Sequence, residues 1–402
     1  MPPRPRTPRS RILCAAAAAG AVIALPACGA FGGAADDDAD AAPSAAASSA
    51  SPSPSEPAPE PFTIAFGGDV HFEGMLRQRL DEDPETAIGP VAEVLSEADL
   101  AVVNLETAIT EGGTPADKEF VFRAPATALD ALAAGGVDVA SVANNHGMDY
   151  GVDGLYDTLA AAEDRGFPLI GIGEDADAAY APHIAEVNGN TVAVIGVTQV
   201  MDDQYIPTWT ATDTQPGMAS AKPDYGLGGD ERTLEAVRAA AEEADAVVVY
   251  LHWGLEGDNC PMQVQTDFAA RLAEAGADVI VGGHAHRVNA GGYLGDAYVH
   301  YGLGNFVFYH GVGDGAETGV LRLTMQGDRV LDDEWLPGTV TGGIPVLAED
   351  EAQISAALDR QAERLACTNL AAAPAGGSAG PSPSEATAAP VGTSAEPSAP
   401  AG

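Results

Sequence analysis

Between residues 62 and 285, short unbroken apolar runs alternate with longer segments rich in Ala, Leu and Glu. Unbroken apolar runs are typical of strands buried on both faces, and the longer segments have the spacing of helices that cover such strands. The predicted strands are 62–66, 100–103, 137–142, 169–172, 191–197, 246–251 and 278–281. The predicted helices are 87–98, 126–134, 151–165, 230–243 and 264–275. This alternation predicts an α/β fold with helices on the outside.

The pattern changes after residue 285. Short runs there predict mostly antiparallel strands at 293–294, 297–301, 306–309, 319–325 and 329–335, and a last helix at 350–366. The two ends contain almost only Ala, Ser, Pro, Gly and acidic residues, which cannot bury enough apolar surface to fold. We therefore expect one folded domain at 62–370, between a disordered spacer at 29–61 and a disordered tail at 371–402.

Residues 1–28 have the pattern of an export signal. Four arginines precede an apolar, Ala-rich stretch at 12–25, which is short for a membrane-spanning helix. The following Leu25-Pro26-Ala27-Cys28 resembles the lipobox of bacterial lipoproteins, in which the cysteine carries lipid and becomes the mature N-terminus. This predicts an extracytoplasmic domain anchored to the cell membrane through Cys28. The alternative is an ordinary signal peptide cleaved near Ala27, which leaves Cys28 as a plain thiol.

Export also bears on the other cysteines. Cys260 and Cys367 are the two cysteines of the predicted folded domain. Oxidising compartments favour disulfides, so we expect a bridge between them. The alternative is a pair of buried thiols.

The charge of the chain limits its partners. It has 18 Lys and Arg against 59 Asp and Glu, a formal net charge of −41 at pH 7. Nucleic-acid binding is excluded, because phosphate contacts need clustered basic residues. The same charge repels an acidic polymer unless bound metal makes a site locally positive.

Five polar motifs follow predicted strands, where α/β proteins usually place their chemistry. They are Gly67-Gly68-Asp69-Val70-His71, Asn104-Leu105-Glu106, Asn144-Asn145-His146-Gly147-Met148-Asp149, His252-Trp253-Gly254 and Gly282-Gly283-His284-Ala285-His286. Each motif alone is common as a turn, a cap or a hydrogen-bonded structural histidine. Together they offer carboxylate, amide and imidazole ligands without cysteine, a set that suits Mn, Fe or Zn. Because strand ends meet at one rim, the set predicts a metal site of the binuclear kind found in hydrolases.

In their order, these motifs resemble the calcineurin-like metallophosphoesterase superfamily. They are more closely similar to its offshoot, the capsule-synthesis CapA family linked to poly-γ-glutamate. Further signatures are Asp149-Tyr150-Gly151, Glu256 and Leu303-Gly304-Asn305-Phe306, so the resemblance spans nearly all of the folded part. It implies a four-layered α/β/β/α sandwich whose loops meet at one edge.

The resemblance also implies roles for single residues. The first of two divalent ions would be held by Asp69, His71 and His286. The second would be held by Asn145, His252 and His284. Glu106 would stand where phosphoesterases have a bridging aspartate, and His146 would protonate a leaving oxygen or steady the transition state. The acidic residue that directly follows this histidine in phosphoesterases is Gly147 here, so Asp149 or a residue elsewhere must orient His146.

Two functions are compatible with this resemblance. The first is a metal-dependent hydrolase on the outer face of the membrane, acting on a phosphoester or amide bond of a cell-surface polymer. The second is a non-catalytic module that binds a nascent polymer or a synthase subunit and helps to export or anchor it. Arg123 and Glu256 are candidates to contact substrate, or structural members of ion pairs. The sequence identifies neither the substrate nor the metal.

Overall fold

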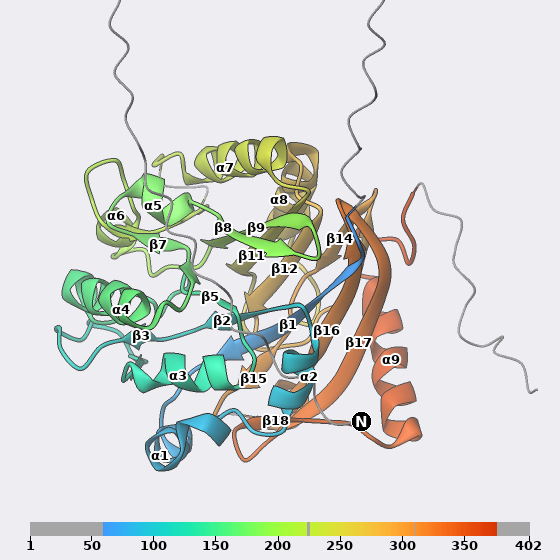
Figure 1. The fold of residues 1–402 in the computed structure, drawn as a ribbon, viewed down its shortest axis with the longest axis horizontal. Helices are drawn as coiled ribbons and strands as arrows, with labels where there is room; N and C mark the ends of the chain where they lie inside the picture. Colours follow the sequence, from blue (N-terminus) through green and yellow to red (C-terminus); the bar gives the residue numbers. More distant parts are fainter. Residues whose placement is uncertain (1–58, 223–225, 310, 376–402) are drawn as a thin grey trace, which may run out of the picture. The chain divides into compact units, whose positions relative to one another are not determined.

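The computed structural model describes residues 59–222, 226–309 and 311–375 (Figure 1). All of them belong to one compact unit that begins at Pro57. The export segment with Cys28, nearly all of the predicted spacer and most of the predicted tail lie outside the described residues. Within the described part, no helix combines the length and apolarity needed to cross a membrane.

The first sheet is centred on β1 (Phe62–Val70), and its strand order is β18-β17-β16-β1-β2-β5-β6. A parallel half contains β2 (Leu100–Leu105), β5 (Val139–Ser141) and β6 (Leu169–Ile170). An antiparallel half contains β16 (Glu317–Gln326), β17 (Arg329–Thr341) and β18 (Ile344–Leu347). The short β15 (Asn305–Val307) lies parallel to the end of β1.

The second sheet has the order β13-β14-β12-β11-β9-β8. Its parallel centre contains β9 (Asn190–Thr198), β11 (Ala246–Trp253), β12 (Val279–His284) and β14 (Ala297–His300). Its antiparallel edges are β8 (His183–Val187) and β13 (Gly291–Leu294). Of the antiparallel strands expected after residue 285, β13, β16 and β17 are confirmed, and β14 pairs antiparallel with β13 but parallel with β12. The short β15 pairs in parallel with β1, and the pattern does not predict the antiparallel β18.

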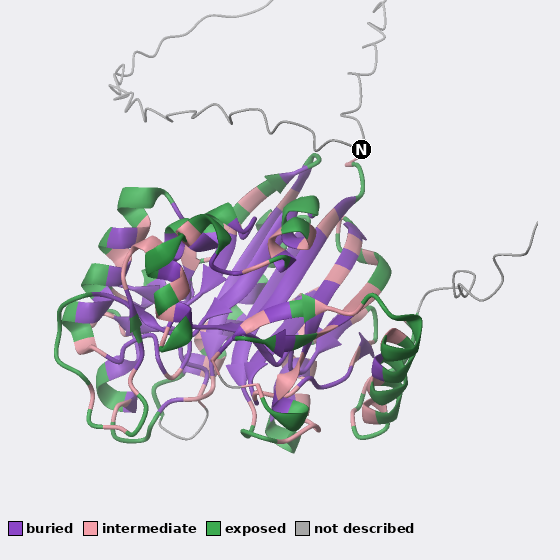
Figure 2. Ribbon diagram, turned by 90° about the horizontal axis from the view of Figure 1, so that it is seen from below, coloured by how far each residue is buried: buried purple, intermediate pink, exposed green. Residues whose placement is uncertain are grey.

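The two sheets face each other and helices cover their outer sides, which is the expected α/β/β/α order. Buried side chains of both sheets, such as Phe66, Val102, Val194 and Tyr250, form the inner core. The helices outside the first sheet are α1 (Met75–Glu82), α2 (Val91–Glu97), α3 (Thr127–Ala134) and α4 (Gly151–Arg165). Those outside the second are α5 (Ala176–Tyr180), α7 (Gly229–Glu243) and α8 (Gln263–Ala275). The central strands are buried, whereas β8, β17 and the outer faces of the helices have exposed residues (Figure 2).

Helix α9 (Glu351–Leu365) packs against β17 and β13. Cys260 and Cys367 form the expected disulfide, with their Cα atoms 5.8 Å apart, which joins the loop after β11 to the end of α9. Ordered contacts also extend past the predicted domain limits. Ala371 and Tyr293 exchange two backbone hydrogen bonds, so residues 371–375 belong to the folded part and not to the tail.

Candidate metal centre

The polar motifs converge because the carboxyl ends of strands from both sheets meet. Asp69 of β1 is in register with Asn104 of β2, and Trp253 of β11 is in register with His284 of β12. Gly283 allows the two sheets to approach, since a Cβ atom at this position would lie 2.2 Å from Oδ1 of Asp69. The backbone N–H of His284 then donates to Oδ2 of Asp69 at 3.0 Å.

The loop that carries His284 and His286 has an unusual backbone. Both residues have positive φ, 85° and 50°, although neither is glycine. This left-handed conformation is unfavourable for residues with a side chain, and it is concentrated at functional sites. It directs both imidazoles of the His-x-His pair toward the carboxylates of the first sheet, and Nδ1 of His286 lies 3.5 Å from Oδ2 of Asp69.

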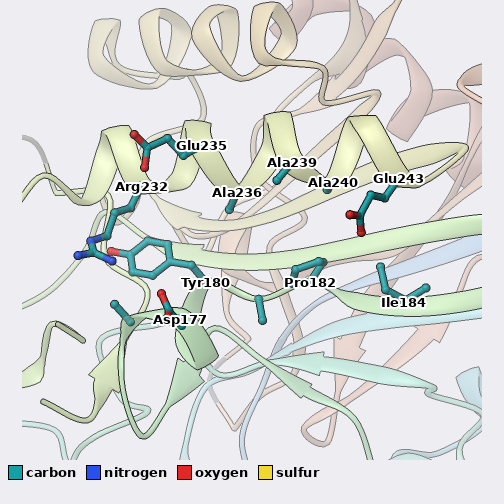
Figure 3. A pocket seen from close by; sticks show the side chains of 12 residues that line it. Asp177, Tyr180, Pro182, Ile184, Arg232, Glu235, Ala236, Ala239, Ala240 and Glu243 are labelled. Atoms are coloured by element: carbon teal, nitrogen blue, oxygen red, sulfur yellow. The ribbon is translucent and has the colours of Figure 1, made fainter. Parts of the chain in front are cut away.

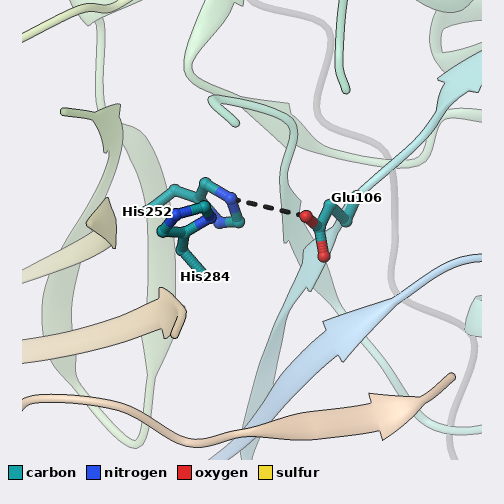
Figure 4. Close-up of side chains that lie close together, drawn as sticks. All are labelled: Glu106, His252 and His284. Carbon is teal, nitrogen blue, oxygen red and sulfur yellow. Dashed lines mark ion pairs between the residues drawn. The ribbon is translucent and has the colours of Figure 1, made fainter. Parts of the chain in front are cut away.

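Two groups of side chains bring potential metal ligands together. The first is Glu106, His252 and His284 (Figure 4), and the second is Asp69, Glu106 and His286. In each group the ligand atoms all lie within 4.8 Å of one another. Glu106 belongs to both groups, so its carboxylate could serve as a ligand in each.

The chemistry of these side chains fits a divalent cation. Among the described residues, neither carboxylate oxygen of Glu106 nor Nδ1 of His284 has a hydrogen-bond partner, although all three atoms are buried. Buried polar atoms of this kind are costly unless a partner compensates them. Oxygen and imidazole nitrogen are ligands of Mn, Fe and Zn. The residues present therefore fit a metal ion.

Burial shifts the pKa values of the same groups. It raises the pKa of Glu106 well above its ordinary range, and the nearby carboxylates of Asp69 and Glu256 raise it further. Burial also raises the pKa of Asp69, against the opposing effect of His286. It lowers the pKa of His252 well below its ordinary value and that of His284 to about 3. The latter two imidazoles are thus neutral at pH 7, which is the form that binds metals.

Three asparagines hold the histidines in place. The side-chain amide of Asn104 donates to Oδ1 of Asp69 at 2.9 Å and lies 3.1 Å from Nδ1 of His252. Asn144 donates to Oδ1 of Asn104 at 3.0 Å and accepts from the backbone N–H of His146 at 3.0 Å. Oδ1 of Asn145, a predicted ligand, lies 2.7 Å from Nε2 of His252. Asn104 and Asn144 occur in the sequence motifs, but nothing in the pattern predicts their positioning role.

Asp149 is the residue that orients His146. Its Oδ2 lies 2.6 Å from Nδ1 of His146 and accepts from the backbone N–H of Phe122, also at 2.6 Å. Its Oδ1 lies 2.7 Å from Nζ of Lys118, whose side chain is 9% exposed. Burial lowers the pKa of His146, and the hydrogen bond to Asp149 opposes this effect. Lys118 belongs to none of the five motifs, and its one signal in the sequence is its rarity, since the chain has only two lysines.

His71, the remaining predicted ligand, is fully buried and is surrounded by aromatic rings. Its ring stacks on Phe122 with centroids 4.9 Å apart and meets Phe308 and Tyr309 edge to face. Nδ1 accepts from the backbone N–H of Glu73 at 3.0 Å, and Nε2 lies 3.3 Å from the backbone nitrogen of Tyr309. His71 is in neither group of ligand atoms, so its role as a ligand stays a prediction.

The two candidate substrate residues have different positions. Glu256 lines a cavity of about 310 Å³ that also contains the rings of His146 and His286. Arg123 is not among the residues that line it. Its guanidinium lies over the ring of Tyr150, 5.0 Å from the centroid, and its backbone N–H donates to Glu73. This position favours a structural role for Arg123.

A second cavity, of about 380 Å³, lies between α5, β8 and α7 (Figure 3). Its lining includes small side chains of α7, such as Ala236 and Ala239, together with the ring of Tyr180. It shares no residue with either group of ligand atoms and contains no histidine. This cavity is therefore separate from the two groups of potential ligands.

Residues 63–310 match the family described as bacterial capsule synthesis protein PGA_cap. The chain is 31% identical over 253 residues to PGA biosynthesis protein CapA of Bacillus subtilis (strain 168), covering 62% of this chain and 64% of the relative. It is 36% identical over 196 residues to capsule biosynthesis protein CapA of Bacillus anthracis, covering 49% of this chain and 46% of the relative. The matched part spans less than two thirds of the length of either relative.

Solved structures give a more distant comparison. A novel phosphatase from Mycoplasma pneumoniae is 13% identical with a TM-score of 0.42, covering 74% of this chain and 97% of that one. A hypothetical protein from Thermus thermophilus is 16% identical with a TM-score of 0.43, covering 69% and 99%. The family match includes all five polar motifs and more than half of the chain. The chain therefore belongs to the bacterial capsule synthesis protein family PGA_cap.

Proposed function

We propose that this protein is a metal-dependent hydrolase that acts in the synthesis or export of a capsule or poly-γ-glutamate-type polymer. The names of the two Bacillus relatives, one for PGA biosynthesis and one for capsule biosynthesis, support the polymer role. The observation that best supports the hydrolase role concerns Glu106. Its two buried oxygens have no hydrogen-bond partner among the described residues, and it belongs to both groups of ligand atoms.

Two divalent ions, of Mn, Fe or Zn, would be held by the two groups. Asp69, Glu106 and His286 would hold one, and Glu106, His252 and His284 the other. When bound, such ions polarise a phosphoester or amide and lower the pKa of water toward neutrality. They would carry about +4 against about −2 from the two carboxylates, so an acidic polymer could approach a chain of net charge −41 at this rim.

His146 would exchange a proton with the leaving group. Asp149 holds Nδ1 of its ring at 2.6 Å, which leaves Nε2 on the side of the cavity, 3.9 Å from Oε1 of Glu106. Phe122 stacks on the ring with centroids 4.0 Å apart and fixes its plane. The imidazole is thus oriented on one edge and available on the other, as general acid–base catalysis requires.

The first experiment measures the metal content of the purified protein and its hydrolysis of bis(p-nitrophenyl) phosphate. We expect bound Mn, Fe or Zn and turnover, and we expect Glu106→Gln to lose both. Glu235→Gln, an exposed glutamate on α7, serves as the control and should retain both. A protein without bound metal would contradict the hydrolase. If the protein binds metal and the polymer but hydrolyses nothing, the non-catalytic polymer-binding function would be favoured.

We propose further that the protein is extracytoplasmic and attached to the cell membrane through lipid on Cys28, where its partners would be the polymer or its synthase complex. The support is the signal pattern that ends in Leu25-Pro26-Ala27-Cys28. Mass spectrometry of the mature protein tests this. A diacylated N-terminal Cys28 is expected, and an unmodified N-terminus at another residue would contradict the anchor.

A further inference from the structure

The cavity beside the metal centre has mainly aromatic walls. Its lining includes Phe120, Phe122, Phe308 and Tyr309, and it reaches the rings of His146 and His286. Phe308 and Tyr309 are stacked, with centroids 5.8 Å apart. At the rim, Phe120 is 53% exposed and Val312 is 86% exposed. Large apolar side chains that remain exposed around a cavity mark a surface for a ligand, and the volume of about 310 Å³ is at the low end of ligand pockets.

Arg287 supplies a positive charge in the same wall. Its guanidinium packs against the backbone of Gly315, since a Cβ atom there would lie 2.8 Å from Nη1. Nη1 donates to the backbone oxygen of His286 at 2.8 Å. Among the described residues no carboxylate forms an ion pair with Arg287, whereas seven other arginines of this acidic chain do pair with Asp or Glu. Those seven are Arg77, Arg165, Arg232, Arg271, Arg322, Arg360 and Arg364.

We propose that the aromatic cavity and Arg287 form a subsite for a planar or apolar group that carries a single carboxylate, next to the bond that the metal centre cleaves. The guanidinium matches a carboxylate in a bidentate manner. Glu256 lies at the same cavity and disfavours a second negative charge, so a monoanion fits better than a phosphate dianion. This subsite rests on the proposed hydrolase function, because the reacting group of its ligand occupies the metal centre.

The test compares the binding of phenylphosphonate and 4-carboxyphenylphosphonate to the manganese-loaded protein by titration calorimetry. The phosphonate occupies the centre without being hydrolysed, and the ring enters the aromatic cavity. We expect the carboxylated ligand to bind about tenfold more tightly, as one charge-assisted hydrogen-bonded pair would give. Arg287→Met should abolish that difference. Phe120→Ala should weaken both ligands alike.

Arg238→Met is the matched control, because Arg238 is an exposed arginine on α7 and the change in net charge is the same. It should keep the tenfold preference. Equal binding of the two ligands by the wild type, or a preference that survives Arg287→Met, would overturn the subsite while leaving the hydrolase intact. If neither phosphonate binds, the subsite is overturned, and the separate assay of phosphodiester hydrolysis decides whether the hydrolase function stands.

Discussion

Lys118 and Asp149 form a buried ion pair behind the histidine that faces the cavity, with Nζ 2.7 Å from Oδ1. The other oxygen of Asp149 lies 2.6 Å from Nδ1 of His146. Lys118 also donates to the backbone oxygen of Asn145, so one ammonium group contacts both the orienting carboxylate and the backbone of a predicted ligand. A buried carboxylate with both oxygens engaged is held in one orientation, and the imidazole that it contacts is held with it.

Replacing Lys118 by Met should separate orientation from metal binding. The change leaves the Asp149 carboxylate buried without its cation, which costs about 3 kcal/mol of stability for a broken buried pair. We expect hydrolysis to fall about 10- to 100-fold while the metal content stays that of the wild type. Lys118→Arg should restore part of the rate. Lys222→Met provides the control, because Lys222 is the other lysine and pairs with Asp203, and neither of these residues lines the cavity.

Loss of metal in Lys118→Met would show instead that the ion pair supports Asn145 more than His146. An unchanged rate with unchanged metal would contradict any positioning role for Lys118.

Substitution of His286 and of His146 should have different effects on metal content. His286 belongs to a group of ligand atoms, whereas His146 is held by Asp149 and belongs to neither group. His286→Ala should therefore lower metal content and activity together. His146→Ala should keep the metal and lose about 10²- to 10⁴-fold in rate, the usual contribution of a general acid or base. Elemental analysis and steady-state kinetics on the same samples measure both quantities, and loss of metal in His146→Ala would make His146 a ligand.

The sequence predicts the fold well where burial is continuous. Helix α4 begins at Gly151 and ends at Arg165 as expected, because Gly166, with φ of 60°, provides its left-handed cap. The inner strands are recognisable as unbroken apolar runs. The pattern does not predict edge strand β8, because its alternate residues, such as Ile184, are exposed. Nor does it predict helix α1, which is mostly polar, with only Leu76 and Leu80 buried.

The site is predictable to the extent that its residues follow strands. Six of the seven predicted ligands lie near one another at the strand ends, since each is near the end of a strand or at most four residues after it. Lys118 could not be predicted, because it contacts Asp149 across 31 positions of chain and lies in a loop without periodicity. The aromatic surroundings of His71 depend on Phe308 and Tyr309, more than 230 positions away. Such contacts are set by the packing of the two sheets and leave no local pattern.

The disulfide should stabilise the cavity as well as the domain. Cys260 lies four residues after Glu256, which lines the cavity. Cys367 follows helix α9. Arg364 of this helix pairs with Glu317 at 2.6 Å, next to the part of the cavity wall formed by Val312 and Gly315. Closing a loop of 107 residues stabilises the fold by roughly 5 kcal/mol on the chain-entropy argument. The double variant Cys260→Ser and Cys367→Ser should lose about this amount in urea unfolding. Equal midpoints for the variant and the oxidised wild type would contradict the expected stabilisation.

His300 should make the protein less stable in mild acid. It is 1% exposed and stacks on Trp335, and burial with nearby Arg364 lowers its pKa to about 3. The unfolded chain takes up this proton near pH 6.5, whereas the folded chain does not until about pH 3, so the unfolded state binds more protons between these values. Stability is therefore lost as the pH falls below 6.5, by about 2 kcal/mol at pH 5 from this residue alone. His300→Gln should show a correspondingly smaller loss. Urea unfolding of both proteins at pH 7 and pH 5 measures the difference, and identical losses would mean that His300 is protonated in the folded state.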